Sequence, residues 1–318
     1  MTVHDAAKAA LKHIVGATLG EKIIVFCDDS QREIGDVFTK AAIEYGLWTR
    51  LVTLPTTSET RREVDPVLQE LLVLQQPHLC LNIFRQNDAE TSFRGSFVRL
   101  ERSKGARIGH CPGIIMEMIT DGALSLLDKD YEQMFSFGES LRWRLKEADK
   151  IHVADPLGSD FTVSVQNRQF SVEKMNVPCG EVMCMNPVGN SFQGKLVCIS
   201  GGGDRIYRNT PVTILSDRGL AGEVQCKNRD IRDKVKFELD RDEGARYLGE
   251  FAFGINPKAR LVDQFLEAEK VLGTIHIAFG GSEYPTKTHL DLLVENPTID
   301  IITADSRSLT IMTKGRFT

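Results

Sequence analysis

The first 110 residues alternate between two kinds of segment, and this alternation constrains the fold more than any other feature of the chain. Short continuous apolar runs, such as Lys22–Cys27 (KIIVFC), have the length and composition of buried strands. Between them lie stretches with apolar residues at helical spacing, such as Arg32–Tyr45. The pattern continues through segments predicted at 48–54, 63–75, 79–84, 91–103 and 106–110. A strand–helix–strand alternation predicts a parallel sheet covered by helices on both faces.

The pattern changes near residue 150, after an amphipathic helix predicted at 130–148. Short β-rich segments follow, divided by Gly, Pro, Asn and Asp turns, and are predicted at 151–154, 160–165, 169–172, 195–200, 211–216 and 220–224. Such segments are typical of antiparallel or mixed sheet. We therefore expect an α/β protein of two domains: a parallel-sheet α/β domain at 1–149, followed by a β-rich mixed α+β metal-binding catalytic domain at 150–318.

Composition excludes several classes of partner. The net charge of −5 gives no electrostatic basis for binding nucleic acid or an anionic membrane surface. No apolar run approaches the roughly 20 residues of a bilayer-spanning helix, and the N-terminus has the pattern of an amphipathic helix rather than of a secretory signal. Seven scattered cysteines are typical of buried free thiols in a reducing compartment. We expect a cytoplasmic protein.

Nucleotide-binding motifs are missing from the sequence. No GxGxxG follows the first predicted strand, and no GxxxxGK[ST] occurs anywhere in the chain. The polar pair Asp28 and Asp29 lies where a parallel sheet could bind a ligand, although a capping turn is the more ordinary reading of that pair. We therefore expect no nucleotide cofactor.

Metal-ligand side chains gather between residues 248 and 294, in apolar or glycine-marked surroundings. The sharpest pair is His289 and Asp291, which Leu290 separates in a strand-like segment. Residues i and i+2 on a strand point to the same face, about 6–7 Å apart. One imidazole and one carboxylate can therefore reach the same metal, or two neighbouring metals.

Two glutamates occupy comparable places in the second half. Glu181 and Glu250 each follow a glycine and precede an apolar run that ends in Asn-Pro. A strand-end carboxylate at the surface is the ordinary reading of either one alone, but a buried charge is costly unless it is paired or bound to metal. Carboxylates mixed with the imidazoles of His276 and His289 suit zinc, cobalt, manganese or ferrous iron, and suit a two-metal site.

The same residues resemble the thermophilic-aminopeptidase family of metallopeptidases, which includes aminopeptidase T and aminopeptidase S. In that family a PxGEV segment, a second GE segment, a HIALG-type segment with a following Tyr, and an HxD segment supply a dinuclear metal centre. The corresponding segments of this chain, in the same order, are Pro178–Val182 (PCGEV), Leu248–Glu250 (LGE), His276–Gly280 (HIAFG) and His289–Asp291 (HLD), with Gly158–Thr162 (GSDFT) resembling a further strand motif.

The resemblance implies a metalloaminopeptidase-like hydrolase that releases N-terminal amino acids. It implies two divalent ions per chain (Zn, Co or Mn) and the ligands Glu181, Glu250, His276, His289 and Asp291. A metal-activated water would attack the scissile carbonyl, with Glu181 or Glu250 as general base. Tyr284 matches the site tyrosine of the family and would donate a hydrogen bond to the reacting carbonyl. A small peptide or amide substrate and a homodimer are the implied partners.

Other functions fit parts of the same pattern. A mononuclear Fe(II) ring-cleaving dioxygenase, similar to 2,5-dihydroxypyridine dioxygenase, shares the fold and the HxD pair but has a histidine near the place of Glu250 and lacks the Glu181 carboxylate. A non-peptide amide hydrolase could use the same ligands. A non-catalytic small-molecule-binding dimer would bind no metal. Metal content separates these readings.

Overall fold

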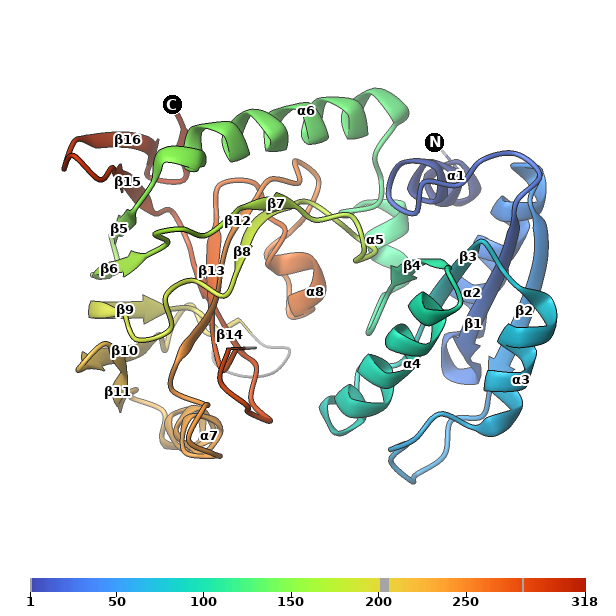
Figure 1. The fold of residues 1–318 in the computed structure, drawn as a ribbon, viewed down its shortest axis with the longest axis horizontal. Coiled ribbons are helices and arrows are strands. Elements are labelled where there is room, and N and C mark those ends of the chain that lie inside the picture. Colours follow the sequence, from blue (N-terminus) through green and yellow to red (C-terminus); the bar gives the residue numbers. More distant parts are fainter. Residues whose placement is uncertain (1, 201–205, 282) are drawn as a thin grey trace. The chain divides into compact units, whose positions relative to one another are not determined.

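A computed structural model describes residues 2–200, 206–281 and 283–318 of the chain. The chain divides into two compact units: residues 1–132 with 174–179, and residues 133–173 with 180–318. The expected fold class is confirmed, since a parallel four-stranded sheet is followed by antiparallel sheets (Figure 1). The domain boundary expected at residues 149 and 150 stays a prediction.

The first unit is built on a parallel sheet with the strand order β2-β1-β3-β4. Every residue of β1 after Lys22 is buried, as expected for a strand covered on both faces. The strands are β1 (Lys22–Asp28), β2 (Trp48–Leu54), β3 (Leu79–Ile83) and β4 (Arg107–His110). The helices are α1 (Val3–His13), α2 (Arg32–Glu44), α3 (Pro66–Gln75), α4 (Thr91–Ser103) and α5 (Met116–Thr120), with short 3-10 helices at Asp29–Gln31 and Asp88–Glu90.

Local capping sets where the helices of this unit begin. The Thr2 side chain accepts a hydrogen bond from the backbone of Asp5, whose carboxylate bonds back to Thr2, and this capping box starts α1. Helix α3 begins at Pro66, later than the predicted start at residue 63, because Asp65 caps its N-terminus and proline suits the first helical position.

One side of the parallel sheet packs against α3 and α4. The buried residues of this core are mainly aromatic and aliphatic, and comprise Ile24, Phe26, Leu68, Leu72, Cys80, Phe84, Phe93, Phe97 and Ala106. The rings of Phe26 and Phe97 pack edge to face, with 4.8 Å between their centroids, a favourable aromatic geometry. This apolar contact explains why the helical segments of the first half carry hydrophobic stripes.

The second unit contains an eight-stranded and a five-stranded sheet, both antiparallel (Figure 1). The larger sheet has the order β11-β10-β9-β6-β5-β15-β16-β17, and its strands are β5 (Lys150–Ala154), β6 (Asp160–Ser164), β9 (Gln193–Cys198), β10 (Val212–Asp217), β11 (Leu220–Gln225), β15 (Thr298–Ile302), β16 (Ser308–Thr313) and β17 (Arg316–Phe317). The smaller sheet has the order β14-β13-β12-β8-β7, and its strands are β7 (Ser171–Val172), β8 (Glu181–Met185), β12 (Leu248–Gly254), β13 (Ile275–Phe279) and β14 (Leu290–Val294).

Helices complete the second unit. Helix α6 (Asp128–Arg144) belongs to the first unit up to Glu132 and then to the second, and a short 3-10 helix at Leu145–Glu147 follows it. Helix α7 (Arg229–Leu239) follows the capping residue Asn228, whose side chain accepts hydrogen bonds from the backbone amides of Asp230 and Ile231. Helix α8 (Phe265–Ala268) is a single turn.

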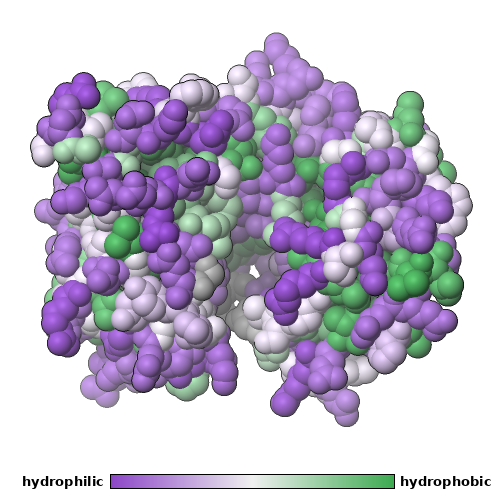
Figure 2. Space-filling model, viewed as in Figure 1, coloured by the Kyte–Doolittle hydropathy of each residue, from purple (hydrophilic) through white to green (hydrophobic). Residues whose placement is uncertain are grey.

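The cysteines agree with the sequence-based expectation of free thiols, and six of the seven are buried. Hydrophilic residues cover most of the visible face of the second unit, and hydrophobic residues gather on that of the first (Figure 2). The seven cysteines all lie within the described residues and are free thiols. Of the helices in residues 2–200, 206–281 and 283–318, none has the length and hydropathy to cross a membrane.

Candidate metal centre

One face of the five-stranded sheet carries the carboxylate and histidine side chains, and the other face is apolar and buried. Cross-strand pairing places Glu250 of β12, Ala278 of β13 and Asp291 of β14 in one row. His276 is two residues before Ala278 on β13 and lies on the same face. Glu181 of β8 pairs with Gly254, which lies on the same face of β12 as Glu250. The alternate residues of these strands face the other way and are buried and apolar: Val182, Cys184, Phe251, Phe253, Ile275, Ile277, Phe279, Leu290, Leu292 and Val294. The small side chain of Ala278 leaves room between the two carboxylates of its row.

One group of ligand side chains, here called the outer triad, comprises Glu250, His289 and Asp291. One ligand atom from each of the three lies within 4.8 Å of the others. The imidazole Nε2 of His289 lies 3.2 Å from Asp291 Oδ1 and 3.7 Å from Glu250 Oε2. His289 immediately precedes β14 rather than lying inside it, and its side chain is 48% exposed. The predicted pairing of His289 with Asp291 is therefore seen in the geometry, at a strand end open to solvent.

A second group, the inner triad, comprises Glu181, Glu269 and His276, again with ligand atoms within 4.8 Å of one another. Glu181 and His276 are almost fully buried. His276 Nε2 lies 3.6 Å from Glu181 Oε1 and 3.2 Å from Glu250 Oε1. Glu250 therefore stands between the triads and contacts a histidine of each.

Two members of this cluster, Glu269 and Lys270, were not predicted from the sequence. Lys270 has no exposed surface, and its Nζ lies 2.7 Å from Glu181 Oε2 and 2.5 Å from Glu269 Oε1. The two residues follow α8 in a turn, where no strand or helix periodicity marks them. The only signal in the sequence is a Glu-Lys pair next to an apolar stretch, which is common on solvated helices.

Backbone contacts fix this turn against β12. The amide of Asn256 donates to the carbonyl of Lys270 at 2.8 Å, and the amide of Gly254 donates to Thr274 at 3.0 Å. A Cβ at Gly254 would lie 2.2 Å from the carbonyl oxygen of Val271, which is far inside van der Waals contact. A glycine is therefore required at the end of β12 for Lys270 to reach Glu181.

The charges of the cluster shift the pKa values of its members. Burial opposes the charged form of His276, but the carboxylates of Glu181 and Glu250 outweigh it and raise the pKa of this histidine to about 9. The Asp291 carboxylate raises the pKa of His289, and His289 in turn holds the pKa of Asp291 down against the effect of burial. Glu181 and Glu269 likewise outweigh burial and raise the pKa of Lys270, so it is an ammonium ion.

The outer triad fits a divalent metal ion. Two carboxylates and an imidazole are ligands that zinc, cobalt and manganese accept, and the half-exposed His289 leaves the group open to solvent. In the inner triad, Glu181 Oε1 is buried without a hydrogen-bond partner among the described residues. An unsatisfied buried carboxylate oxygen costs free energy unless a cation or a proton donor reaches it.

Tyr284 stacks on Tyr247, with ring centroids 3.7 Å apart and an angle of 22° between the rings. Its ring also lies against Gly189, where a Cβ would come within 2.7 Å of it. These contacts hold the ring in place. The contribution of Tyr284 to the site stays a prediction.

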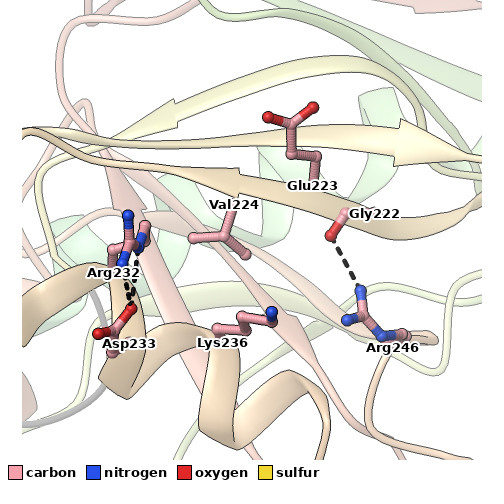
Figure 3. A pocket seen from close by; sticks show the side chains of 7 residues that line it. All are labelled: Gly222, Glu223, Val224, Arg232, Asp233, Lys236 and Arg246. Carbon is pink, nitrogen blue, oxygen red and sulfur yellow. Dashed lines mark hydrogen bonds and ion pairs between the residues drawn. The ribbon is translucent and has the colours of Figure 1, made fainter. Parts of the chain in front are cut away.

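A pocket on the second unit contains none of the residues of the two triads. It is formed by β11, α7 and Arg246, and is lined by Gly222, Glu223, Val224, Arg232, Asp233, Lys236 and Arg246 (Figure 3). Arg232 pairs with Asp233, and Arg246 donates to the carbonyls of Ala221 and Gly222. Since its arginines are already engaged, we interpret it as a solvated polar groove.

Comparisons with known proteins support the fold. The structure is similar over 100% of its length to that of 2,5-dihydroxypyridine dioxygenase from Pseudomonas putida KT2440, with a TM-score of 0.71, 14% identity and 98% coverage of that chain. It is also similar over 99% of its length to wild-type AmpT, an aminopeptidase from Thermus thermophilus, with a TM-score of 0.69, 15% identity and 98% coverage of that chain. No family model and no curated protein sequence matches the chain. Both structural neighbours are enzymes, and at this identity the likeness concerns the fold.

Proposed function

We propose that the chain is a metal-dependent hydrolase that releases N-terminal amino acids from small peptides. The observation that carries this proposal is the outer triad, in which the carboxylates of Glu250 and Asp291 flank the imidazole of His289. A divalent ion held there would lower the pKa of a water and polarise a substrate carbonyl. The whole-length similarity to an aminopeptidase supports the same class.

The protein's own groups take the remaining roles. We assign proton transfer to Glu181, because its Oε1 is buried and accepts no hydrogen bond among the described residues, whereas Glu250 belongs to the outer triad that would hold the metal. His276 lies between these two carboxylates and orients them. Tyr284, held rigid by its stack on Tyr247, would donate a hydrogen bond to the oxyanion that develops on the substrate.

A mononuclear iron dioxygenase is the second candidate, because a 2,5-dihydroxypyridine dioxygenase is a structural neighbour with a TM-score of 0.71. Ferrous oxygenases typically use two histidines and one carboxylate. The outer triad has two carboxylates and one histidine, with His289 between Glu250 and Asp291. This donor set favours hydrolysis over oxygen chemistry. An amide other than a peptide would use the same groups and stays an alternative.

The discriminating experiment uses two assays on the same full-length protein. Aminoacyl-p-nitroanilides are tested with Zn²⁺, Co²⁺ or Mn²⁺, and 2,5-dihydroxypyridine is tested with Fe²⁺ while oxygen uptake is followed. Amide cleavage that requires metal supports the proposal. Oxygen uptake with ring loss, and no amide cleavage, overturns it. A homodimer and a cytoplasmic location stay predictions.

A further inference from the structure

Lys270 occupies a place that a cation must fill. Lysine is almost never fully buried unless it is paired, and this lysine has no exposed surface. Its ammonium contacts one oxygen each of Glu181 and Glu269, at 2.7 and 2.5 Å. Without it, the buried carboxylate of Glu181 and the partly buried carboxylate of Glu269 would have no ammonium ion between them.

The position of this ammonium is fixed by the fold rather than by a flexible side chain alone. The carbonyl of Lys270 accepts from Asn256, and Gly254 lets the following backbone lie directly against β12. The ammonium is therefore held by a backbone anchored to β12, by complete burial and by its two carboxylate contacts. A cation of this kind is a permanent part of the inner triad.

The two triads consequently differ in the charge that they offer to a metal. The outer triad presents the two carboxylates of Glu250 and Asp291 with a histidine. The inner triad also presents two carboxylates, but both already share the ammonium of Lys270. A divalent ion bound by the inner carboxylates would be repelled by a fixed positive charge on their other side, and this repulsion is strong in a buried site.

We infer that Lys270 is the resident cation of the inner triad, so that the chain binds one divalent ion tightly, at the outer triad, instead of the two that the sequence resemblance implies. This inference rests on the metal-dependent function proposed above. Lys270 acts as a positioning residue: it neutralises Glu181 and Glu269 and directs the free Oε1 of Glu181 toward His276.

The test measures how many ions the full-length protein binds. Protein stripped with a chelator is titrated with Co²⁺ by calorimetry and by visible absorption, and bound metal is counted after gel filtration. The variants are Lys270→Met, which removes the charge at similar length, Lys270→Arg, which retains it, and Glu269→Gln, which removes an inner ligand and leaves the lysine in place.

The parent and Lys270→Arg should each bind one ion tightly, and Glu269→Gln should also bind one, with an affinity within about threefold of the parent. In Lys270→Met the affinity for a second ion should rise by at least about tenfold, because the repelling charge is gone. If Lys270→Met does not fold, Glu269→Gln decides alone, since an inner metal would be lost with its ligand.

Two tightly bound ions in the parent, falling to one in Glu269→Gln, would overturn this inference and leave the proposed hydrolase intact. A Lys270→Met protein that folds and still binds one ion would also overturn it. Absence of any bound ion from the parent would remove both this inference and the proposed function.

Discussion

Glu250 Oε1 lies 3.2 Å from Nε2 of His276, so one carboxylate joins the inner and outer triads. The other oxygen of Glu250 faces His289 at 3.7 Å, and the side chain is almost fully buried. A carboxylate in this position cannot be exchanged for a neutral group without changing both triads.

Replacing Glu250 by glutamine should therefore weaken metal binding more than any substitution outside the outer triad. Glutamine preserves the shape but removes the negative charge that faces both histidines. The affinity for Zn²⁺ should fall by at least about tenfold, which loss of a partner of a metal ligand already causes. Calorimetric titration measures it, and Glu223→Gln on the exposed part of β11 is the control. Equal affinity in the two variants contradicts the assigned position of the metal.

Glu101 makes stability depend on pH in the first unit. It is buried and accepts a hydrogen bond from Asn82 at 2.7 Å, while burial raises its pKa from the usual 4.5 to about 8. Between these values the folded chain holds a proton that the unfolded chain has lost, so the free energy of unfolding falls as pH rises from about 4.5 to about 8.

Glu101→Gln should remove this pH dependence and stabilise the protein at pH 8 by roughly 1–3 kcal/mol relative to the parent. Urea unfolding at pH 5 and at pH 8 measures the change. The same substitution at the exposed Glu117 is the control. A stability difference between pH 5 and pH 8 that is identical in Glu101→Gln and the parent would show that Glu101 is not the group responsible.

Gly254→Ala tests the close approach that places Lys270. The added methyl group would meet the Val271 carbonyl oxygen at 2.2 Å, so the turn after α8 must move. We expect a loss of about 1–3 kcal/mol of stability, the usual cost of overpacking. Gly95→Ala in α4 is the control, because there a methyl group meets only an arginine side chain at 3.4 Å and alanine favours the helix. Equal stability of both variants in thermal unfolding contradicts the steric account.

Arg61 holds two buried carboxylates at the end of the parallel sheet. It contacts Asp28 and Glu90, at 2.5 and 2.6 Å, and its guanidinium lies over the ring of Phe93. Arg61→Ala should cost about 2–4 kcal/mol, because Asp28 loses its charge partner while Glu90 retains Arg85.

The control for Arg61 is Arg32→Ala, which breaks an exposed pair with Asp36 and should cost less than about 1 kcal/mol. Chemical unfolding measures both variants. Equal costs would mean that the buried ion pairs of the first unit contribute no more than a surface pair.

The fold could be predicted from the sequence where a segment has a strong local pattern of apolar residues. Strand β1 is buried from Ile23 to Asp28 because helices cover both faces of its sheet, and that condition also produces a continuous apolar run in the sequence. Helix α3 begins at Pro66, three residues after the predicted start at 63, because the Asp65 side chain caps its N-terminus there.

The residues of the candidate site that lie on strands could be predicted from the sequence. Those that lie in the turn after α8 could not. Glu250 and Asp291 lie on one face because of period-2 alternation, which the sequence displays. Glu269 and Lys270 reach the cluster through a turn held by Gly254 and Asn256, and no periodic pattern records such a contact. The sequence therefore indicated the strand residues that cluster here but not the Glu269–Lys270 turn that joins them, and the role of the cluster as a metal centre stays a prediction.

Metal content of the purified protein tests the central claim most directly, with His289→Ala and Asp291→Ala compared with the parent after equal exposure to Zn²⁺. We predict that the parent retains one ion per chain and cleaves aminoacyl-p-nitroanilides. Both variants should lose the ion and the activity while their circular dichroism stays that of the parent, because His289 and Asp291 lie at the half-open end of the sheet rather than in its core. Variants that retain as much zinc as the parent would contradict the account.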